Sequence, residues 1–583
     1  MKGKQLLVDF VKAHKRSYIA GIIILIATSF IAMTIPKIIG IITDGLNKKN
    51  MLPAQIYRYV LLMLAIVVTI FILKYIWRYF LIGNCRSLEC YLRDNLFKHL
   101  QTLPLSFYSN NRTGDLVAYA INDVQAVRMT FGFGSIQILD GAAASIISII
   151  FMANTINPVL TVMALAPVPI AVFIMVKVGR LIRGRFKKVQ EAFASISDKV
   201  QESISGIRVI KAFAQEEEEV ESFIKFSQQR VDTQMKLTGV SALLGPCAQI
   251  CFGISFLFFI VYGSKLVTGG SITLGDYVAF NTYMMAIMGP VMNISRIIDV
   301  WQRGIASYKR LKVLFETPPG SGLNSEECDI CDINGSLEIK NLNFTYPGTG
   351  KRALKNINLL IEKGNTLGIL GKTGSGKTTL VNLLLRLYDV NEGHIFIDGK
   401  DINGLPVDVL RECIGYVPQD NFLFSTTIRN NIEFFRSIYS DYEIEQAARL
   451  SGVYDNIVSF PDGFDTVVGE RGVTLSGGQK QRISIARALV KNPSILILDD
   501  SLSAVDTKTE EEILGNIKRL LENRTGIIIS HRVSTVRHAD EIIFMDGGRI
   551  TERGTHEQLM ELMGNYYKLY KSQTDQDIEE AAV

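Results

Sequence analysis

Long apolar runs dominate the first 317 residues of the chain, and shorter alternating runs replace them after Pro318. A helix needs about 20 mostly apolar residues to cross the hydrocarbon core of a bilayer. The N-terminal half is therefore predicted to be an integral membrane bundle of six helices. The predicted spans are residues 19–43, 56–82, 133–156, 158–178, 242–264 and 274–300.

The connections between these spans differ in charge. Residues 83–132 and 179–241 are long and rich in Lys and Arg, whereas the connection near 154–158 has neither. Basic connections remain on the cytoplasmic side of a membrane. We therefore expect a multi-pass protein of the cell membrane with both termini and both long connections in the cytoplasm, although Lys48 and Lys49 give a weak contrary signal.

The chain divides into four parts by composition. Pro, Gly and acidic residues concentrate in a linker at 318–335, and after it strand-like and helical runs alternate, which predicts an α/β nucleotide-binding fold. The transmembrane domain, with six helices and long cytoplasmic extensions, is expected at 1–317. The nucleotide-binding domain is expected at 336–572, and a polar C-terminal tail at 573–583.

Charge and cysteine content argue against nucleic-acid binding, a disulfide framework and a zinc site. The net charge is only +5 and the basic residues are dispersed, so we expect no nucleic-acid partner. Seven cysteines, an odd number, argue against a disulfide framework. Cys328 and Cys331 form a single CxxC in the linker, and without a second pair nearby we do not interpret them as a zinc site.

The strongest chemical signal is a glycine-rich segment that starts at Gly371 and reads GKTGSGKT. It matches the phosphate-binding pattern GxxxxGK[ST] and lies between a strand and a helix, as that pattern requires. Lys377 is predicted to meet the β- and γ-phosphates of ATP, while Thr378 and Asp499, at the end of an apolar strand, are predicted to bind Mg²⁺. The expected phosphate contacts are Gly371, Lys372, Thr373, Gly374, Ser375, Gly376, Lys377, Thr378 and Thr379.

Further motifs give the chain a family resemblance. The segment LSGGQKQR, which begins at Leu475, resembles the signature motif of ATP-binding cassette proteins. The other motifs of that family are also present: the aromatic loop at Tyr346, the glutamine loop at Gln419, the exporter-type loop at 466–472, the D-loop at 503–506 and the switch histidine His531. The whole chain is similar to the half-transporters of bacterial multidrug exporters.

The resemblance implies a translocating ATPase that works as a dimer with ATP and Mg²⁺. Each ATP would lie between the phosphate loop of one chain and Ser476, Gly477, Gly478 and Gln479 of the other. Tyr346 would stack on adenine, Gln419 would contact both the metal and the attacking water, and His531 would take part in catalysis. Elements near 111–116 and 212–217 would couple the membrane helices to the cassettes.

One position departs from the family pattern. Active members usually carry a glutamate after the Mg²⁺ aspartate, and this chain has Asp500. Its carboxylate lies roughly 1.5 Å further from the water, and misplacements of about 1 Å cost on the order of 100-fold in rate. With the signature and His531 intact, we expect a heterodimer whose partner, a second half-transporter, supplies the glutamate. The alternative is a homodimer in which Asp500 is a weak catalytic base.

The substrate is less clearly indicated. Polar residues within the apolar spans are Gln137, Asp140, Gln249, Asn281 and Asn293. Asp140 could pair with a cationic drug, because an acid within a membrane span is a candidate functional site, but we favour a role in helix packing. The leading hypothesis is export of small hydrophobic or amphipathic compounds. The alternatives are a homodimeric lipid or peptide exporter, an importer of the same architecture, and a channel gated by the cassette.

Overall fold

The computed structural model describes residues 3–320, 333–469, 472, 475–502 and 507–581. The chain divides into two compact units, which are considered separately. The first comprises Met1–Gln101 and Thr113–Thr317, and the second comprises Thr102–Arg112 and Pro318–Val583. The predicted linker residues 321–332, including Cys328 and Cys331, lie outside the described residues, as do Glu470, Arg471 and the D-loop at 503–506.

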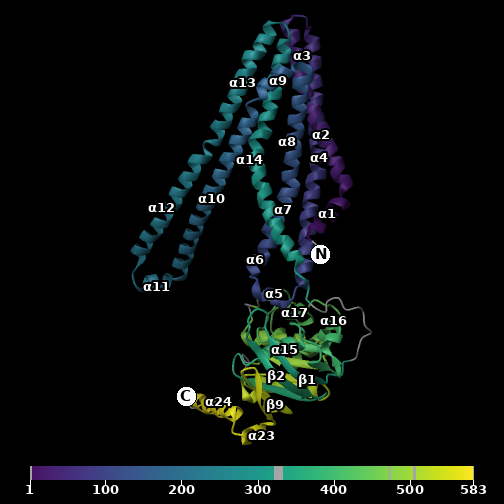
Figure 1. Ribbon diagram of the computed structural model, residues 1–583. Coiled ribbons are helices and arrows are strands. Elements are labelled where there is room, and N and C mark those ends of the chain that lie inside the picture. Colours follow the sequence, from purple (N-terminus) through teal and green to yellow (C-terminus); the bar gives the residue numbers. More distant parts are fainter. Residues whose placement is uncertain (1–2, 321–332, 470–471, 473–474, 503–506, 582–583) are drawn as a thin grey trace. The chain divides into compact units, whose positions relative to one another are not determined.

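All the regular elements in the described part of the first unit are helices, joined by short turns and loops (Figure 1). Three short stretches, η1 to η3, are π-helical turns within otherwise continuous helices. The elements are α1 (Gly3–Ala13), α2 (Lys15–Ala32), α3 (Thr34–Asn47), α4 (Pro53–Thr102), α6 (Thr113–Ala118), η1 (Tyr119–Asp123), α7 (Val124–Arg128), η2 (Met129–Gly134), α8 (Ser135–Phe151), η3 (Met152–Ile156), α9 (Pro158–Leu165), α10 (Val168–Ser205), α11 (Ile207–Ala212), α12 (Glu216–Ser241), α13 (Leu244–Thr268) and α14 (Leu274–Glu316).

Five helical stretches of the described residues are long and apolar enough to cross a membrane, and they contain the first five predicted spans. They are Lys15–Asn47, Pro53–Thr102, Thr113–Ile156, Pro158–Ser205 and Glu216–Thr268.

The sixth predicted span, 274–300, lies in α14 and does not meet that measure of length and composition. This helix is more polar because it packs against α3, α8, α10 and α13. Phe280 and Tyr283 of α14 are fully buried. A helix enclosed by other helices has less surface facing lipid and therefore needs fewer apolar residues.

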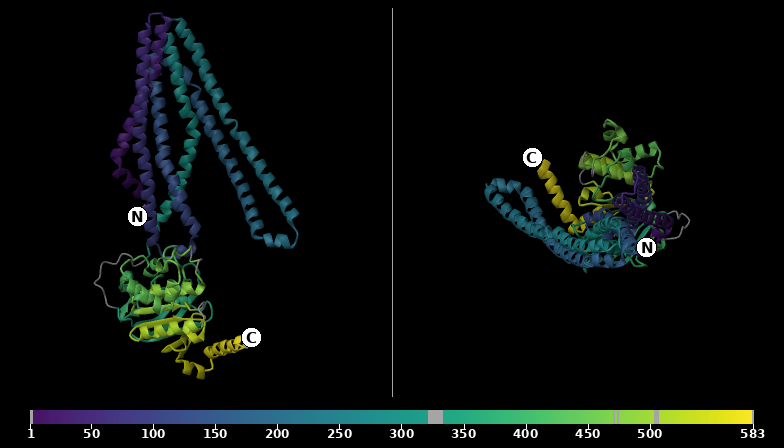
Figure 2. Two further views of the ribbon diagram at one scale, coloured as in Figure 1. Left: turned by 180° about the vertical axis from the view of Figure 1, so that it is seen from behind. Right: turned by 90° about the horizontal axis from the view of Figure 1, so that it is seen from above.

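Two of the long helices extend far beyond the thickness of a bilayer. The stretch Pro158–Ser205 has 48 residues and Glu216–Thr268 has 53, whereas about 20 residues are enough to cross the hydrocarbon core. In both Figure 1 and Figure 2, α10 and α12 run side by side and diverge from the other helices of this unit. These lengths leave room for extensions outside the bilayer, as predicted from the sequence.

Close backbone contacts hold α14 against its neighbours at both ends. Near its start, a Cβ on Gly275 would lie 2.1 Å from the carbonyl oxygen of Gly40, and Asp44 accepts a hydrogen bond from the Gly275 N–H at 2.7 Å. Near its other end, a Cβ on Gly304 would lie 1.8 Å from the Thr130 hydroxyl. Such small residues allow membrane helices to approach closely.

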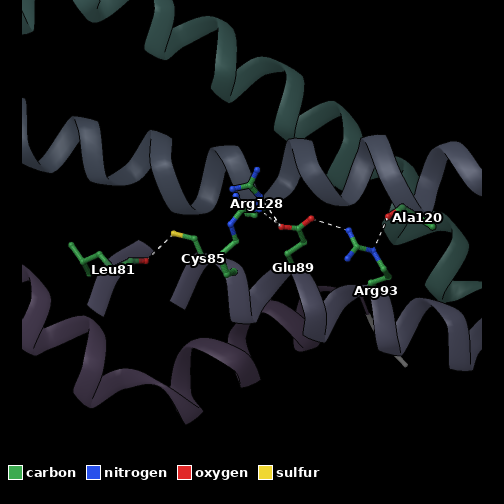
Figure 3. A network of polar contacts seen from close by, with 7 residues as sticks. Leu81, Cys85, Glu89, Arg93, Ala120 and Arg128 are labelled. Carbon is green, nitrogen blue, oxygen red and sulfur yellow. Dashed lines mark hydrogen bonds and ion pairs between the residues drawn. The ribbon is translucent and has the colours of Figure 1, made fainter. Parts of the chain in front are cut away.

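An ion pair links α4 to α7 in the same unit (Figure 3). Glu89 of α4 accepts hydrogen bonds from Arg86 at 3.1 Å and Arg93 at 2.8 Å, and its carboxylate lies 3.0 Å from Nε of Arg128 on α7. The Glu89 and Arg128 side chains are only 15% and 13% exposed. Ion pairs that are shielded from water in this way are screened less by salt than surface pairs.

The second unit contains two sheets. One is four-stranded and antiparallel in the order β2-β1-β4-β5, and the other is six-stranded in the order β10-β9-β3-β8-β7-β6, with β9, β3, β8, β7 and β6 parallel. The strands are β1 (Leu337–Thr345), β2 (Arg352–Ile361), β3 (Thr366–Gly371), β4 (Ile395–Ile397), β5 (Lys400–Asp401), β6 (Ile414–Val417), β7 (Ile495–Asp499), β8 (Thr525–Ile529), β9 (Glu541–Asp546) and β10 (Arg549–Gly554). The predicted α/β fold is confirmed.

Helices cover the parallel sheet and build its apolar core. The neighbouring strands β3, β8 and β7 are almost entirely buried, as expected for parallel strands with both faces covered. The helices of this unit are α5 (Leu105–Asn110), α15 (Lys377–Leu384), α16 (Val407–Cys413), α17 (Ile428–Glu433), α18 (Asp441–Leu450), α19 (Tyr454–Val458), α20 (Gly477–Leu489), α21 (Thr507–Leu521), α22 (Val533–Val536), α23 (His556–Glu561) and α24 (Asn565–Ala581).

The polar tail predicted at 573–583 begins within a helix. Residue 573 lies inside α24, which continues to Ala581. Polar composition suggested a tail, but the helix is anchored by its first turns, where Tyr566 is fully buried. Leu569 and Tyr570 also pack against the apolar core of this unit.

Candidate functional site

The phosphate-binding segment connects β3 to α15, as predicted. The strand ends at Gly371 and the helix begins at Lys377. A Cβ on Gly371 would lie 2.2 Å from the carbonyl oxygen of Met545, and Gly376 has φ 104° at the N-cap of α15. Both positions therefore require glycine, and the loop leaves backbone N–H groups at a helix N-terminus, where anions bind.

Lys377 is held within this loop. Its side chain is largely buried, and Nζ donates to the carbonyl oxygens of Gly371 at 2.7 Å and Lys372 at 3.1 Å. Burial lowers the pKa of the Lys377 ammonium, and the nearby carboxylates of Asp499 and Asp500 oppose this shift. A buried cation whose hydrogen-bond partners among the described residues are carbonyl oxygens is suited to bind a phosphate.

Asp499 ends β7 next to this loop and has an unsatisfied oxygen. The residue is 1% exposed, and its Oδ2 has no hydrogen-bond partner among the described residues. Burial raises the pKa of Asp499, and Asp500 adds to this effect, whereas a hydrogen bond from Thr378 and the charge of Lys377 lower it. The buried Ser375 hydroxyl also lacks a partner in the described part of the chain.

These orphaned oxygens fit Mg²⁺ bound together with a nucleotide. Among the described residues no group of three or more His, Cys, Asp or Glu could hold a metal ion alone. Mg²⁺ in such sites takes one or two protein ligands, and the remainder are phosphate oxygens and water. Thr378 and Asp499 provide that small ligand set, so the residues present fit the predicted group.

Asp500 has an unusual backbone conformation. Its φ is 47°, in the left-handed region that Asp enters more readily than most residues. Its Oδ2 lies 3.4 Å from Nε2 of Gln419, which follows β6, and its N–H donates to the carbonyl of Ile529 at 2.9 Å. The structure thus brings Gln419 and Asp500 together beside Asp499, as the sequence predicted for a water-binding position.

The switch histidine follows β8. Ser530 accepts a hydrogen bond from the N–H of Arg532 at 2.9 Å, which closes a tight turn around His531. The turn also contacts Glu510 of α21 through Arg532 and Gln573 of α24 through backbone groups. Sequence reasoning did not find Glu510 or Gln573, because neither belongs to a motif and only folding brings them to the turn.

Tyr346 lies beside the first helix of the phosphate-binding segment. Its hydroxyl is 2.9 Å from Oγ1 of Thr379, and its ring forms edge-to-face contacts with Phe344 and Tyr388, with both centroids 5.1 Å away. Packing against other rings fixes the orientation of an aromatic side chain. This position is consistent with the predicted stacking on adenine.

The signature motif forms the N-terminus of α20. Ser476 is the N-cap, its Oγ accepts from the N–H of Gln479 at 3.3 Å, and Gln479 Oε1 accepts from the N–H of Ser476 at 3.0 Å. This reciprocal capping box stabilises the helix start. Ser476 and Gly477 are exposed, so the positive end of a helix of 13 residues faces outward, and Gly478 lies in its first turn.

The first predicted coupling element, 111–116, is divided between the two units. The compact second unit includes Thr102–Arg112, so Asn111 belongs to it while Thr113–Leu116 belongs to α6 of the first unit. Within the second unit, Ser109 of α5 lies 3.4 Å from the Tyr388 hydroxyl. The segment that packs with the nucleotide-binding fold is therefore α5, whose apolar and aromatic residues lie before the polar stretch chosen from sequence.

The second predicted coupling element, 212–217, forms the turn between α11 and α12. Ala214 has φ 51° and Phe213 is 72% exposed. An aromatic side chain of that exposure at a helix turn is a candidate contact surface.

Comparison with known proteins covers nearly the whole chain. Residues 18–291 match the family model of the ABC transporter transmembrane region, and residues 354–503 match that of the ABC transporter. The chain is 39% identical, over 97% of its length and 96% of the relative, to the probable multidrug resistance ABC transporter ATP-binding/permease protein YheI of Bacillus subtilis (strain 168).

Two further similarities concern lipid transport and a solved structure. The chain is 37% identical to the ATP-dependent lipid A-core flippase of Syntrophus aciditrophicus (strain SB), over 83% of this chain and 80% of that protein. It also resembles the structure of a bacterial Atm1-family ABC exporter with ATP bound, with a TM-score of 0.78 and 26% identity over 96% of this chain and 98% of that one.

Proposed function

The chain belongs to the ATP-binding cassette transporter family, and we propose that it forms half of a multidrug-type exporter in the cell membrane. It is a multi-pass membrane ATPase. The finer proposals are that it pairs with a different half-transporter, that its cassette lies in the cytoplasm, and that it moves small hydrophobic or amphipathic compounds outward.

The residues around the phosphate-binding segment suggest how the nucleotide is handled. The loop amides and Lys377 would orient the phosphates, with Lys377 exchanging its carbonyl partners for phosphate oxygens. Thr378, Asp499 and Gln419 would hold Mg²⁺, which neutralises phosphate charge when bound. Asp500 and His531 would orient and polarise the attacking water.

The second half of each nucleotide site is proposed to come from the partner. Ser476 and Gln479 use their side chains in a capping box of their own, and the α20 N-terminus is exposed. A helix N-terminus attracts anions. Ser476, Gly477, Gly478 and Gln479 would therefore meet the γ-phosphate of ATP bound by the other chain.

A cavity between α8 and α14 supports the multidrug proposal. Its volume is about 480 Å³, within the range of roughly 300–1,000 Å³ of small-molecule sites. Four polar side chains line it: Gln137, Asp140 and Ser145 from α8 and Asn293 from α14. The remaining lining is apolar and comprises Ile138, Gly141, Ala142, Gly289, Pro290, Val291, Ile294, Ile297 and Ile298.

Asp140 lies in the wall of this cavity, whereas from the sequence we favoured a role in helix packing. Within the described part of the chain it forms no ion pair or hydrogen bond. The helices instead touch at its neighbour, where a Cβ on Gly141 would lie 3.2 Å from Pro290. An uncompensated acid among apolar side chains favours a ligand with a positive charge and an apolar body.

Transport into inverted membrane vesicles tests this proposal, with Asp500→Glu in the parent chain and in every variant so that ATP turnover can drive uptake. We expect Asp140→Asn to lower ATP-driven uptake of ethidium, a lipophilic cation, about ten-fold, which corresponds to the loss of about 1.4 kcal/mol of binding. Uptake of a neutral dye should be unchanged. Asp299→Asn, which removes an exposed carboxylate paired with Arg303 on the same helix, serves as the control.

The same assay separates the alternatives. Equal uptake of ethidium by Asp140→Asn and the parent chain would contradict the cation site. Accumulation in right-side-out vesicles instead of inverted ones would indicate an importer. ATP-dependent transfer of a fluorescent phospholipid without dye uptake would favour the lipid exporter.

A further inference from the structure

The C-terminal helix α24 is anchored firmly at its start. Glu552 of β10 accepts hydrogen bonds from the N–H groups of Asn565 at 2.5 Å and Tyr566 at 3.0 Å. The Tyr566 side chain is fully buried, with its hydroxyl 2.6 Å from Nδ1 of His556. A carboxylate at a helix N-terminus satisfies the free N–H groups and complements the helix dipole, so the direction of α24 is fixed.

Two turns along α24, the side-chain amide of Gln573 forms hydrogen bonds to the backbone on both sides of Arg532. Nε2 donates to the carbonyl oxygen of His531 at 2.7 Å, and Oε1 accepts from the N–H of Val533 at 2.9 Å. Val533 is the first residue of α22, so its N–H has no partner inside that helix. Both ends of the Gln573 amide are thus used, and the peptide groups that flank Arg532 are held in one orientation.

The turn is held from its other side by α21. Glu510 is 4% exposed and accepts from the Thr535 hydroxyl at 2.6 Å and from Arg532 at 3.3 Å. These contacts involve side chains of the turn, whereas Gln573 bonds to the backbone of His531 itself. Gln573 is therefore the contact that acts most directly on the orientation of the histidine.

We infer that Gln573 is a positioning residue for ATP turnover, acting through the backbone of His531. The inference rests on the proposed role of His531 and extends the nucleotide site to the C-terminal helix. Catalytic groups must be placed to within a fraction of an ångström, and misplacements of about 1 Å cost on the order of 100-fold in rate. Loss of the two bonds should therefore affect turnover more than nucleotide affinity.

Two substitutions distinguish the effect of the two Gln573 hydrogen bonds from the effect of its packing. Gln573→Met keeps the length of the side chain and removes both hydrogen bonds. Gln573→Glu keeps an acceptor for the Val533 N–H and loses the donor to His531. Ser572→Ala, at the neighbouring exposed position of the same helix, is the control.

The first measurement is hydrogen–deuterium exchange of the full-length chain without nucleotide. We expect the Val533 amide to exchange about five-fold faster in Gln573→Met, which corresponds to the loss of a hydrogen bond of about 1 kcal/mol. It should remain protected in Gln573→Glu and Ser572→Ala, and amides of β8 should be unchanged in all variants. Unchanged Val533 exchange in Gln573→Met would overturn the inference without bearing on drug transport.

The second measurement is ATPase kinetics in nanodiscs, with Asp500→Glu in every variant so that turnover is above background. We expect Gln573→Met to lower kcat about ten-fold with KM for ATP unchanged, and Gln573→Glu to be intermediate. In the presence of His531→Ala, Gln573→Met should have no further effect, because residues that act through one another are not additive.

Two results would overturn the proposal at this stage. One is that the effects of His531→Ala and Gln573→Met multiply, and the other is that His531→Ala leaves kcat intact. The proposed cation transport could survive either result, because the vesicle assay does not depend on Gln573.

Discussion

Two buried charges of opposite sign dominate the nucleotide site at the scale of single residues. Burial lowers the pKa of Lys377 and raises that of Asp499, so each shift favours the neutral form. Both residues are thus less stable as ions in the folded chain than they would be in water. The site reduces the stability of the ligand-free protein in order to bind phosphate and metal.

Asp499→Asn should stabilise the protein without ligand. Because the pKa of Asp499 is raised above its ordinary value of 3.8, its ionised form lowers the free energy of unfolding once the pH exceeds the raised pKa. Above the raised pKa this cost is present in full, and the variant should gain on the order of 1 kcal/mol. The gain should disappear as the pH falls toward the ordinary pKa.

The measurement is the midpoint of thermal unfolding without nucleotide, from pH 7 down toward the ordinary pKa of 3.8. The exposed carboxylate at the end of β9 provides the control Asp546→Asn, which should show no gain. With ATP and Mg²⁺ the order should reverse, since the parent chain alone retains a full metal ligand set. A lower midpoint for Asp499→Asn at pH 7 without nucleotide would contradict the argument.

At the scale of elements, α14 depends on glycine for its contact with η2. Gly304 is buried against Thr130, whose hydroxyl donates to the carbonyl of Val300 at 2.8 Å. Nearby, Arg310 of α14 forms an ion pair with Asp123 of η1, with Nε 3.0 Å from Oδ2. These contacts fasten α14 to the helix that continues into α8.

Gly304→Ala should separate these helices. The added Cβ would lie 1.8 Å from the Thr130 hydroxyl oxygen and 3.0 Å from the carbonyl of Ala126, and overpacking of this kind costs about 1–3 kcal/mol. We expect a lower unfolding midpoint in detergent. Gly184→Ala in α10, where a Cβ meets nothing within 4 Å, should instead be neutral or slightly stabilising; equal effects of the two variants would refute the packing argument.

At the scale of the whole molecule, the proposed heterodimer rests on Asp500, which stands where active family members carry a glutamate. We expect the purified chain alone to turn over slowly, and Asp500→Glu to raise its ATPase rate on the order of 100-fold. Asp500→Asn should stay at or below the parent rate. The left-handed φ of 47° makes this position less tolerant of Glu than of Asp, so the unfolding midpoint should be measured alongside the rate.

Pairing with a second half-transporter that carries the glutamate should restore fast hydrolysis without any substitution. That activity should depend on Ser476 of this chain, which would complete the site of the partner. Brisk hydrolysis by the unmodified chain alone would contradict the heterodimer and support the homodimer with Asp500 as base.

Local pattern was enough for the elements and for most of the nucleotide site. The order of membrane helices, the α/β cassette and the segment at Gly371 follow from hydrophobic periods and from glycine spacing, because each depends on residues that are adjacent in the chain. Lys377, Asp499, Gln419 and Asp500 were predicted from motifs whose positions along strands fix where they lie.

Tertiary contacts determined the surroundings of Gln573 and Asp140, which the pattern of apolar and polar residues along the chain could not predict. Gln573 reads as part of a polar tail, yet Glu552 and the buried Tyr566 set the direction of α24 and bring its amide to His531. Asp140 could be read as a packing residue until α8 and α14 were seen to leave a cavity beside it. The sequence by itself determined the elements and the motif chemistry, which arise from neighbours along the chain. Only the fold decided which distant side chains meet, because those contacts depend on how helices and strands pack.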